Sequence, residues 1–340
     1  MIKSVKNKFI STFEQLLRHY DTQLELFERI NKIKQNVPIN ENMVAPYFKH
    51  DIEESGSISE RDDIVFITSR FRTGSTMLWN LFRNMNDCTA YYEPFNERRW
   101  FDKAFRGAGV DQTHLGVNDY WTEYDGLAEL GAFYQEDWIR EDLHMDEKSW
   151  DPNMKNYIDL LVGKSKQRPI LQFNRIDFRL GWIKKNYPNA KLLHLYRNPR
   201  DQWCSFLTDK VKMNKDDVIT SYEDNFYLDI WCNDLAKFFP FLSPNKTKHP
   251  YQRFYYLWKL SYLYGRHYAD LSMAYEDFCN NPKQHLTEMN KVLNWKSLEE
   301  EQLLTLIKSP NQDTWKKYAD EGWFYELECH CEKVLTDFFK

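Results

Sequence analysis

The sequence has no run of about 18 apolar residues, the length that a membrane-spanning helix needs. Its first 20 residues also lack the uninterrupted apolar core of a secretory signal peptide. Positive charge is not in excess either, because 46 Lys and Arg stand against 51 Asp and Glu, for a net charge of −5. Binding to nucleic acid or to an anionic membrane is therefore not expected. Together these absences predict a soluble, cytoplasmic protein.

The six cysteines are scattered along the chain, and in a reducing compartment we expect them to be free thiols. Cys329-His330-Cys331 has the composition of a metal site, but it has no second ligand pair at the spacing of a zinc finger. We interpret this tripeptide as part of an amphipathic C-terminal helix with two half-buried thiols. No metal site is predicted.

Aromatic residues are abundant, with 12 Trp, 21 Tyr and 23 Phe in 340 residues, enough for a large core and a binding cleft. We predict one α/β domain over residues 61–340. An apolar stripe among charges over residues 4–36 predicts a helical extension, which with its connection covers residues 1–60. Periodicity is poor over about residues 100–165, where we expect a lid or acceptor-binding insertion. Short apolar runs predict buried strands at 63–69, 169–173 and 191–196.

The first of these strands leads into the loop RFRTGST and then into a helix pattern over residues 77–85. A strand, a small-residue loop and a helix start are how α/β proteins bind a phosphate-like anion, because loop N–H groups and the helix dipole both face it. Arg72 adds a cation there. The loop lacks the first Gly and the Lys of the nucleotide-binding form GxxxxGK[ST], and Gly74 stands at the position of that Lys. An ordinary strand-to-helix turn is the alternative interpretation.

A second candidate anion site follows the strand at 191–196. Arg197 ends that strand, Asp201 can cap a helix predicted over 202–211, and Ser205 lies eight residues after Arg197. A guanidinium and a hydroxyl so placed can bind one phosphate together. Taken alone, the pattern also fits a structural ion pair. Two anion sites at strand ends of one sheet imply a ligand with two separated phosphates.

These two motifs resemble those of the sulfotransferases that use 3′-phosphoadenosine 5′-phosphosulfate (PAPS), especially the carbohydrate, tyrosyl-protein and bacterial branches. The loop matches the family's motif R/K-S/T-G-S/T-S/T, which holds the 5′-phosphosulfate, through Arg72, Thr73, Gly74, Ser75 and Thr76. Arg197 and Ser205 match the family's 3′-phosphate motif. The resemblance implies a P-loop-like three-layer domain, with a central mostly parallel sheet flanked by helices.

Two further matches extend the resemblance over about residues 63–295, although nothing matches between 100 and 165. Glu93, in Tyr-Glu-Pro-Phe, stands where these branches carry their catalytic base. Tyr275, in Tyr-Glu-Asp-Phe before Pro282, matches a tyrosine that approaches the nucleotide. The resemblance thus implies sulfuryl transfer from PAPS to an acceptor hydroxyl or amine, with release of the product PAP and without a metal.

In such a reaction the acceptor attacks sulfur in line, and charge builds on the bridging oxygen near Arg72, Ser75 and Thr76. Glu93 is the predicted general base, and a capping or surface carboxylate is its alternative role. Arg175 stands where related enzymes often have Lys, and could only stabilise charge.

Other side chains are candidates for roles in the same reaction. His114 and His144 are alternative bases, but their context favours surface residues. Trp315-Lys316-Lys317 is a candidate to close over the nucleotide.

The acceptor is less determined. Residues 111–153 hold twelve Asp or Glu against Arg140 and Lys148, which fits either a solvated surface or an acceptor-binding lid. Because an acidic lid would repel a polyanionic glycan, we expect a neutral or cationic small-molecule or carbohydrate acceptor. An ATP-dependent small-molecule kinase and a non-catalytic PAP or nucleotide sensor are the alternative functions.

Overall fold

The computed structural model describes residues 58–340 apart from 108, 112, 113, 115 and 296–299, and these belong to one compact unit, Glu54–Lys340. The predicted helical extension lies, up to residue 57, outside the described residues. The division of the chain at residue 60 and the limits of the insertion stay predictions. No helix in the described part combines the length and the apolar character needed to cross a membrane.

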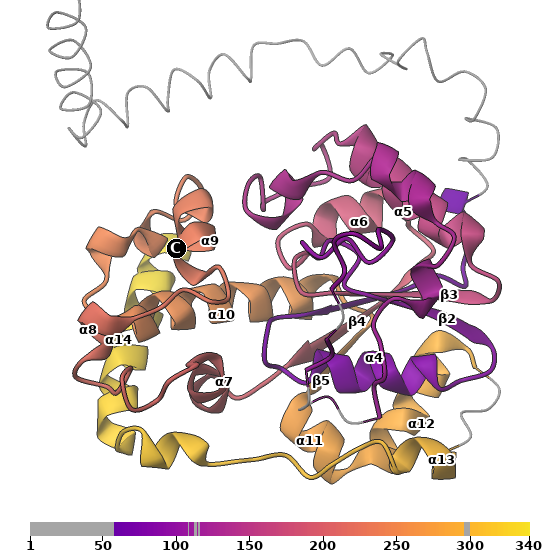
Figure 1. Cartoon of the computed structure of the whole chain (residues 1–340). Coiled ribbons are helices and arrows are strands. Elements are labelled where there is room, and N and C mark those ends of the chain that lie inside the picture. Colours follow the sequence, from indigo (N-terminus) through magenta and orange to yellow (C-terminus); the bar gives the residue numbers. More distant parts are fainter. Residues whose placement is uncertain (1–57, 108, 112–113, 115, 296–299) are drawn as a thin grey trace, which may run out of the picture. The chain divides into compact units, whose positions relative to one another are not determined.

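The centre of the described unit is a five-stranded sheet in which every neighbouring pair is parallel (Figure 1). Its strand order is β2-β3-β1-β4-β5. The strands are β1 (Val65–Ser69), β2 (Cys88–Tyr92), β3 (Arg168–Phe173), β4 (Lys191–Tyr196) and β5 (Leu271–Ala274). All five residues of β1 are buried because helices cover both faces, and the apolar residues Val65, Phe66 and Ile67 precede the buried polar residues Thr68 and Ser69. The predicted parallel sheet is confirmed.

Helices cover the two faces of the sheet, so that the domain has three layers (Figure 1). One face carries α4 (Ser75–Arg83), α11 (Tyr275–Asn280) and α12 (Pro282–Leu293). The other carries α5 (Pro152–Lys164), α6 (Leu180–Asn186) and α10 (Pro250–Tyr268). Strands β1 and β3 are neighbours, but the chain continues from β1 into α4 on one face of the sheet and from β3 into α6 on the other. This divergence opens a crevice at the carboxyl end of the sheet, where α/β folds bind ligands.

A second group of helices extends the domain beyond the sheet: α7 (Pro199–Phe206), α8 (Val218–Ser221), α9 (Leu228–Leu235) and α14 (Glu321–Phe339). Helix α13 (Glu300–Leu304) packs beside α12 instead, and its Leu303 belongs to the core of the sheet. Short 3-10 helices span Thr122–Tyr124, Ala128–Ala132, Glu136–Ile139, Pro240–Leu242, Pro244–Lys246 and Thr314–Lys317. Side chains of α7, α9, α10 and α14 share a core of their own, separate from the core of the sheet. Trp203 of α7 is fully buried in it, which fixes Ser205 two residues along the same helix.

Three local expectations need correction. Strand β2 was not predicted, because CTAYY is short and is neither continuously apolar nor regularly alternating. Helix α7 begins at Pro199 and its N-cap is Asn198, whose side chain accepts from the backbone N–H groups of Arg200 and Asp201, so that Asp201 is not the cap. The C-terminal helix forms as predicted, but Cys331 is buried against α10 and Cys329 is exposed.

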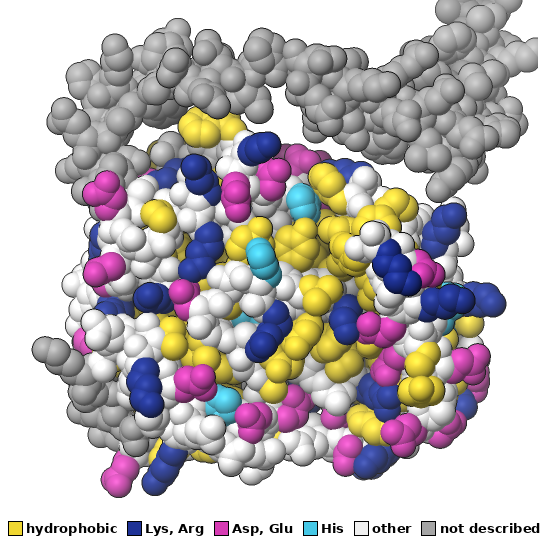
Figure 2. Space-filling model, turned by 180° about the vertical axis from the view of Figure 1, so that it is seen from behind, with side chains coloured by type: hydrophobic (Ala, Val, Ile, Leu, Met, Phe, Trp, Pro, Cys, Tyr) yellow, Lys and Arg dark blue, Asp and Glu magenta, His cyan; other side chains and the backbone are white. Residues whose placement is uncertain are grey.

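The abundant aromatic residues are divided between core and surface. Trp79, Trp182, Trp203 and Trp231 are among the largest fully buried side chains. Other large apolar side chains are exposed, among them Phe238, Leu263, Phe338 and Phe339. Figure 2 shows the face behind the view of Figure 1, where apolar side chains gather between charged ones. A third set of aromatic residues lines the cavity described next.

Candidate active site

Every strand of the sheet delivers side chains to one cavity of about 820 Å³ at its carboxyl edge. The loop after β1 gives Arg72, Gly74, Ser75 and Thr76, β2 gives Glu93, β3 gives Asn174 and Arg175, β4 gives Arg197, and β5 gives Tyr275. Ser205 joins them from α7. Parallel strands end at the same edge, so residues far apart in sequence meet there. Nine of the ten residues predicted for the site line this cavity.

Thr73 is the exception, because its buried hydroxyl donates to the carbonyl oxygen of Arg70 (2.7 Å) and closes the loop from within. Gly74 is the N-cap of α4 and has φ +94°, a left-handed conformation that favours glycine. A Cβ atom at Gly74 would lie 2.3 Å from Cε2 of Tyr275. The loop therefore needs glycine both for its backbone conformation and for the close packing of Tyr275.

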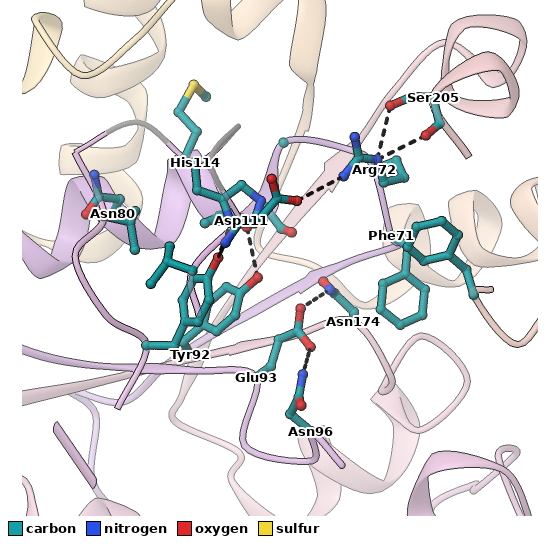
Figure 3. Close-up of a pocket in the computed structure, with 18 of the residues that line it drawn as sticks. Phe71, Arg72, Asn80, Tyr92, Glu93, Asn96, Asp111, His114, Asn174 and Ser205 are labelled. Atoms are coloured by element: carbon teal, nitrogen blue, oxygen red, sulfur yellow. Dashed lines mark hydrogen bonds and ion pairs between the residues drawn. The ribbon is translucent and has the colours of Figure 1, made fainter. Parts of the chain in front are cut away.

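The two predicted anion sites touch each other directly. Arg72 has φ 65°, an uncommon conformation for a residue with a side chain, and its Nε donates to Ser205 Oγ (3.1 Å) and to the Ser205 carbonyl oxygen (3.1 Å). Figure 3 shows this side chain reaching across the cavity to Ser205. Arg197 Nη1 in turn donates to the Arg72 carbonyl oxygen (3.0 Å). Arg72, Arg197 and Ser205 thus form one continuous cationic and hydroxyl surface.

Arg197 is held from the side that faces the C-terminal segment. Its Nη2 donates to the carbonyl oxygen of Asn311 (3.2 Å), and its guanidinium lies 5.2 Å from the centre of the Tyr275 ring. Its Nε is buried and has no hydrogen-bond partner among the described residues. Lys210, Lys308, Ser309, Asn311 and Thr314 complete the lining here, none of which was predicted.

The candidate segment Trp315-Lys316-Lys317 does not line this cavity, since its upstream neighbours do so instead. The buried carboxylate of Asp201 fixes that arrangement by accepting from the backbone N–H of Asp313 (3.0 Å) and the hydroxyl of Thr314 (2.7 Å). Trp315 packs into the second core against Phe324. No local pattern in the sequence could have shown this, because Asp201 and Asp313 are 112 residues apart.

Glu93 is buried, with 6% of its side chain exposed, and its carboxylate accepts three hydrogen bonds. Asn174 donates to Oε1, while Asn96 (2.7 Å) and Arg175 Nη1 (2.8 Å) donate to Oε2. Figure 3 shows the two asparagines converging on this carboxylate. Its backbone has φ 38°, again left-handed, which places a strained residue at the site. A capping or surface role for Glu93 does not fit this burial.

Arg175 is placed differently from the expectation that it stabilises charge on the reacting group. Its Nη1 donates to Glu93 and its Nη2 donates to Glu97 (2.7 Å), so both terminal nitrogens of the guanidinium are hydrogen-bonded to carboxylates. The guanidinium lies 5.0 Å from the centre of the Phe71 ring, and 2% of the side chain is exposed. In this structure Arg175 therefore orients Glu93.

Of the two alternative bases, His114 lines the cavity and His144 does not. His114 is half-buried and its Nδ1 shares a hydrogen bond with the hydroxyl of Tyr120, so the surface interpretation is wrong for it. Burial lowers the pKa of His114 below its usual value. His144 bonds instead to the hydroxyl of Tyr264 (2.9 Å).

The acidic stretch contributes little charge to the site. Of its twelve carboxylates only Asp111 lines the cavity, 3.8 Å from Arg72 Nη1. Others form ion pairs elsewhere, such as Glu123 with Arg83 (2.7 Å). Six cationic side chains and three carboxylates line the cavity, among the residues that the structure describes. The site is therefore positively charged, as an anionic ligand requires.

Comparisons with known proteins agree with this geometry. A model of the sulfotransferase family matches residues 64–300. The chain belongs to the sulfotransferase family. No curated protein matches the sequence. Among the described residues of this sulfotransferase, no group of three or more His, Cys, Asp or Glu side chains could hold a metal ion.

Solved structures similar to this sulfotransferase are distant in sequence. The sulfotransferase domain from the curacin biosynthetic pathway is 15% identical, with 81% of this chain and 96% of that chain covered and a TM-score of 0.40. Sulfotransferase STF9 from Mycobacterium avium is 12% identical, with 86% and 79% covered and a TM-score of 0.45. Retinol dehydratase in a complex with retinol and PAP is 16% identical, with 84% and 86% covered and a TM-score of 0.34.

The contact between Gly74 and Tyr275 gives the first testable prediction. Gly74→Ala adds a Cβ 2.3 Å from the Tyr275 ring at a left-handed backbone position, and we expect it to lower the free energy of unfolding by about 1–3 kcal/mol. Urea denaturation measures the change. The control is Gly163→Ala in α5, where the nearest atom is 3.4 Å away and alanine should be neutral or stabilising. Equal stability of Gly74→Ala and the wild type would contradict the geometry.

Proposed function

We propose that this sulfotransferase transfers a sulfuryl group from PAPS to a hydroxyl, or an amine, of a small-molecule or carbohydrate acceptor and releases PAP. The observation that carries the proposal is the direct contact of the two anion motifs, Arg72 with Ser205 and Arg197 with Arg72, beside the buried carboxylate of Glu93. A donor with two separated phosphate groups and a nucleophile that must lose a proton need this combination.

The donor is assigned to the cationic half of the cavity. The loop from Arg72 to Thr76 would hold the 5′-phosphosulfate. No side chain in the described part of the protein caps the N-terminus of α4, so the backbone N–H groups of its first turn can donate to an anion held by the loop. Arg197 and Ser205 would hold the 3′-phosphate, with Lys210 and Lys308 as further cations. Tyr275 would contact the nucleoside between them.

The transfer needs one bond to sulfur to form as another breaks. The acceptor oxygen attacks sulfur in line, the bond from sulfur to the bridging phosphate oxygen breaks, and the electron pair stays on PAP. Arg72 and the loop N–H groups stabilise the charge that develops there. The acceptor's proton passes to Glu93. A carboxylate has about four acceptor positions, and the three hydrogen bonds to Glu93 leave room for the proton.

The acceptor is assigned to the aromatic half of the cavity, beyond Glu93. Phe71, Trp100, Phe226 and Tyr227 line it, and faces of this kind suit a sugar ring or an apolar hydroxylated molecule. The indole N–H of Trp100 is buried and has no hydrogen-bond partner among the described residues.

Charge near Glu93 supports a neutral acceptor. Glu93 and Glu97 are offset by Arg175 and Arg98, all of which line the cavity. Of the carboxylates in the described part of residues 111–153, only Asp111 lines the cavity, so an acidic lid that would repel a polyanionic glycan is not formed there. The preference for a neutral or cationic acceptor stays a prediction.

Each of the two alternative functions leaves some features of the site without a purpose. A kinase would need the loop lysine that Gly74 replaces, and it has no use for the contact between Arg72 and Ser205. A nucleotide sensor would keep both phosphate motifs, but it has no use for a buried, triply hydrogen-bonded carboxylate in the adjoining half of the cavity.

Ligand-induced stabilisation separates the sulfotransferase from a kinase. At 100 times its dissociation constant, PAP should stabilise the folded protein by about 2.7 kcal/mol and raise the melting temperature by several degrees. ATP with magnesium at the same concentration should raise it less, because it lacks the 3′-phosphate that Arg197 and Ser205 would bind. Differential scanning fluorimetry measures both. A shift with ATP and magnesium but none with PAP would contradict the proposal.

Replacing the predicted base separates the enzyme from a sensor. Glu93→Gln removes the proton acceptor, and the rate of transfer from PAPS should fall about 10²- to 10⁴-fold. The dissociation constant of PAP, measured by calorimetry, should stay within about twofold, because Glu93 lies outside the cationic half of the cavity. Circular dichroism checks that the variant is folded. Unchanged turnover would remove Glu93 from the role of base.

A further inference from the structure

The predicted base belongs to a row of three charges, of which the first two are buried. Arg175 lies between Glu93, at 2.8 Å from Nη1, and Glu97, at 2.7 Å from Nη2. The exposed fractions of the side chains are 6% for Glu93, 2% for Arg175 and 41% for Glu97. The row therefore runs from the reacting end of the cavity, through a fully buried guanidinium, to a carboxylate in contact with water.

A base paired with one arginine alone has a difficulty. A guanidinium stays protonated, so its charge favours the ionised carboxylate and opposes proton uptake by it. Once the carboxylate took a proton, the buried arginine would lose its counter-charge, which is costly in a dry site. A second carboxylate on the opposite edge of Arg175 removes both problems. Before the proton moves to the first carboxylate, the second one shares the positive charge of Arg175. After the proton has moved, the second carboxylate remains as the counter-charge of Arg175.

We propose that Glu97 is a positioning residue of the reaction, which acts through Arg175 to keep Glu93 oriented and able to take a proton. This inference rests on the proposed function, in which Glu93 is the base. Arg175 cannot turn away from the row, because it also lies over the rings of Phe71 (5.0 Å) and Tyr227 (5.6 Å). Asn96 and Asn174 fix the other side of Glu93.

Few other groups near the row change protonation in the neutral range. The titratable and charged groups around Glu93 and Glu97 include Arg175, His114, Tyr92, Tyr120, Tyr124, Tyr134 and Tyr227, with Arg99 and Glu136 beside Tyr134. Burial raises the pKa of each of these tyrosines. Burial lowers the pKa of His114, so His114 can contribute to an acid limb and needs a control.

The test is the pH dependence of single-turnover PAP formation from PAPS, with water as the probe nucleophile. In Glu97→Gln the whole charge of Arg175 acts on Glu93, which then holds a proton less firmly. The plateau rate should fall on the order of tenfold, because a weaker base accepts the proton less readily. The acid limb should move to lower pH by roughly half a unit to one unit, because the ionised form of Glu93 persists further into acid.

Three variants control this result. Glu97→Asp keeps the charge and should restore the position of the acid limb. Glu136→Gln changes a carboxylate of the same kind that pairs with Arg99 outside the cavity, and should change nothing. In the background His114→Asn the shift caused by Glu97→Gln should persist. The dissociation constant of PAP should be unchanged in Glu97→Gln.

Two results would overturn the inference alone. A wild-type rate and an unmoved acid limb in Glu97→Gln would remove Glu97 from the reaction. A lower rate with an unmoved limb would show that Glu97 only supports the structure. A wild-type protein that binds PAP but forms none from PAPS, either with water or with any hydroxylated acceptor, would overturn the proposed function together with this inference.

Discussion

The site depends on one constraint, which is that five parallel strands end at a single edge of the sheet. Register between neighbours sets the geometry: Ser69 of β1 pairs with Leu195 of β4, so Arg72 and Arg197 follow at nearly the same height. The two predicted anion motifs lie 125 residues apart in sequence, yet Arg197 donates a hydrogen bond to Arg72. Because β2 and β3 lie on the other side of β1, Glu93 and the side chains that hydrogen-bond to it adjoin the same loop.

Burial of charge shapes the second half of the site. A buried carboxylate or guanidinium is stable only with partners. Glu93 and Arg175 pair with each other, Asn96 and Asn174 donate further hydrogen bonds to Glu93, and Glu97 accepts one from Arg175. The same contacts restrict the carboxylate to one orientation. In this way, the requirement for charge pairing also prepares the geometry that proton transfer needs.

Sequence patterns identified the parts of the site that are local. The loop at Arg72 and the pair Arg197 and Ser205 each lie within nine consecutive residues, so local patterns marked both as candidate anion sites, and the resemblance suggested a role for each. Strand β2 carried too weak a pattern to predict, although Glu93 at its end was identified by resemblance. The hydrogen bond from Asn174 to Glu93 and the lining at Lys308 and Asn311 depend on tertiary contacts across the sheet or from the C-terminal segment, which spacing does not encode.

The central claim is that these five strand ends form a site for sulfuryl transfer from PAPS. A screen of neutral hydroxylated acceptors with PAPS labelled in its sulfuryl group tests this claim most directly. The account predicts that label appears on at least one acceptor and that PAP forms in equal amount. Label that stays on PAPS with every acceptor, while the γ-phosphoryl group of ATP is transferred in the same screen, would contradict it.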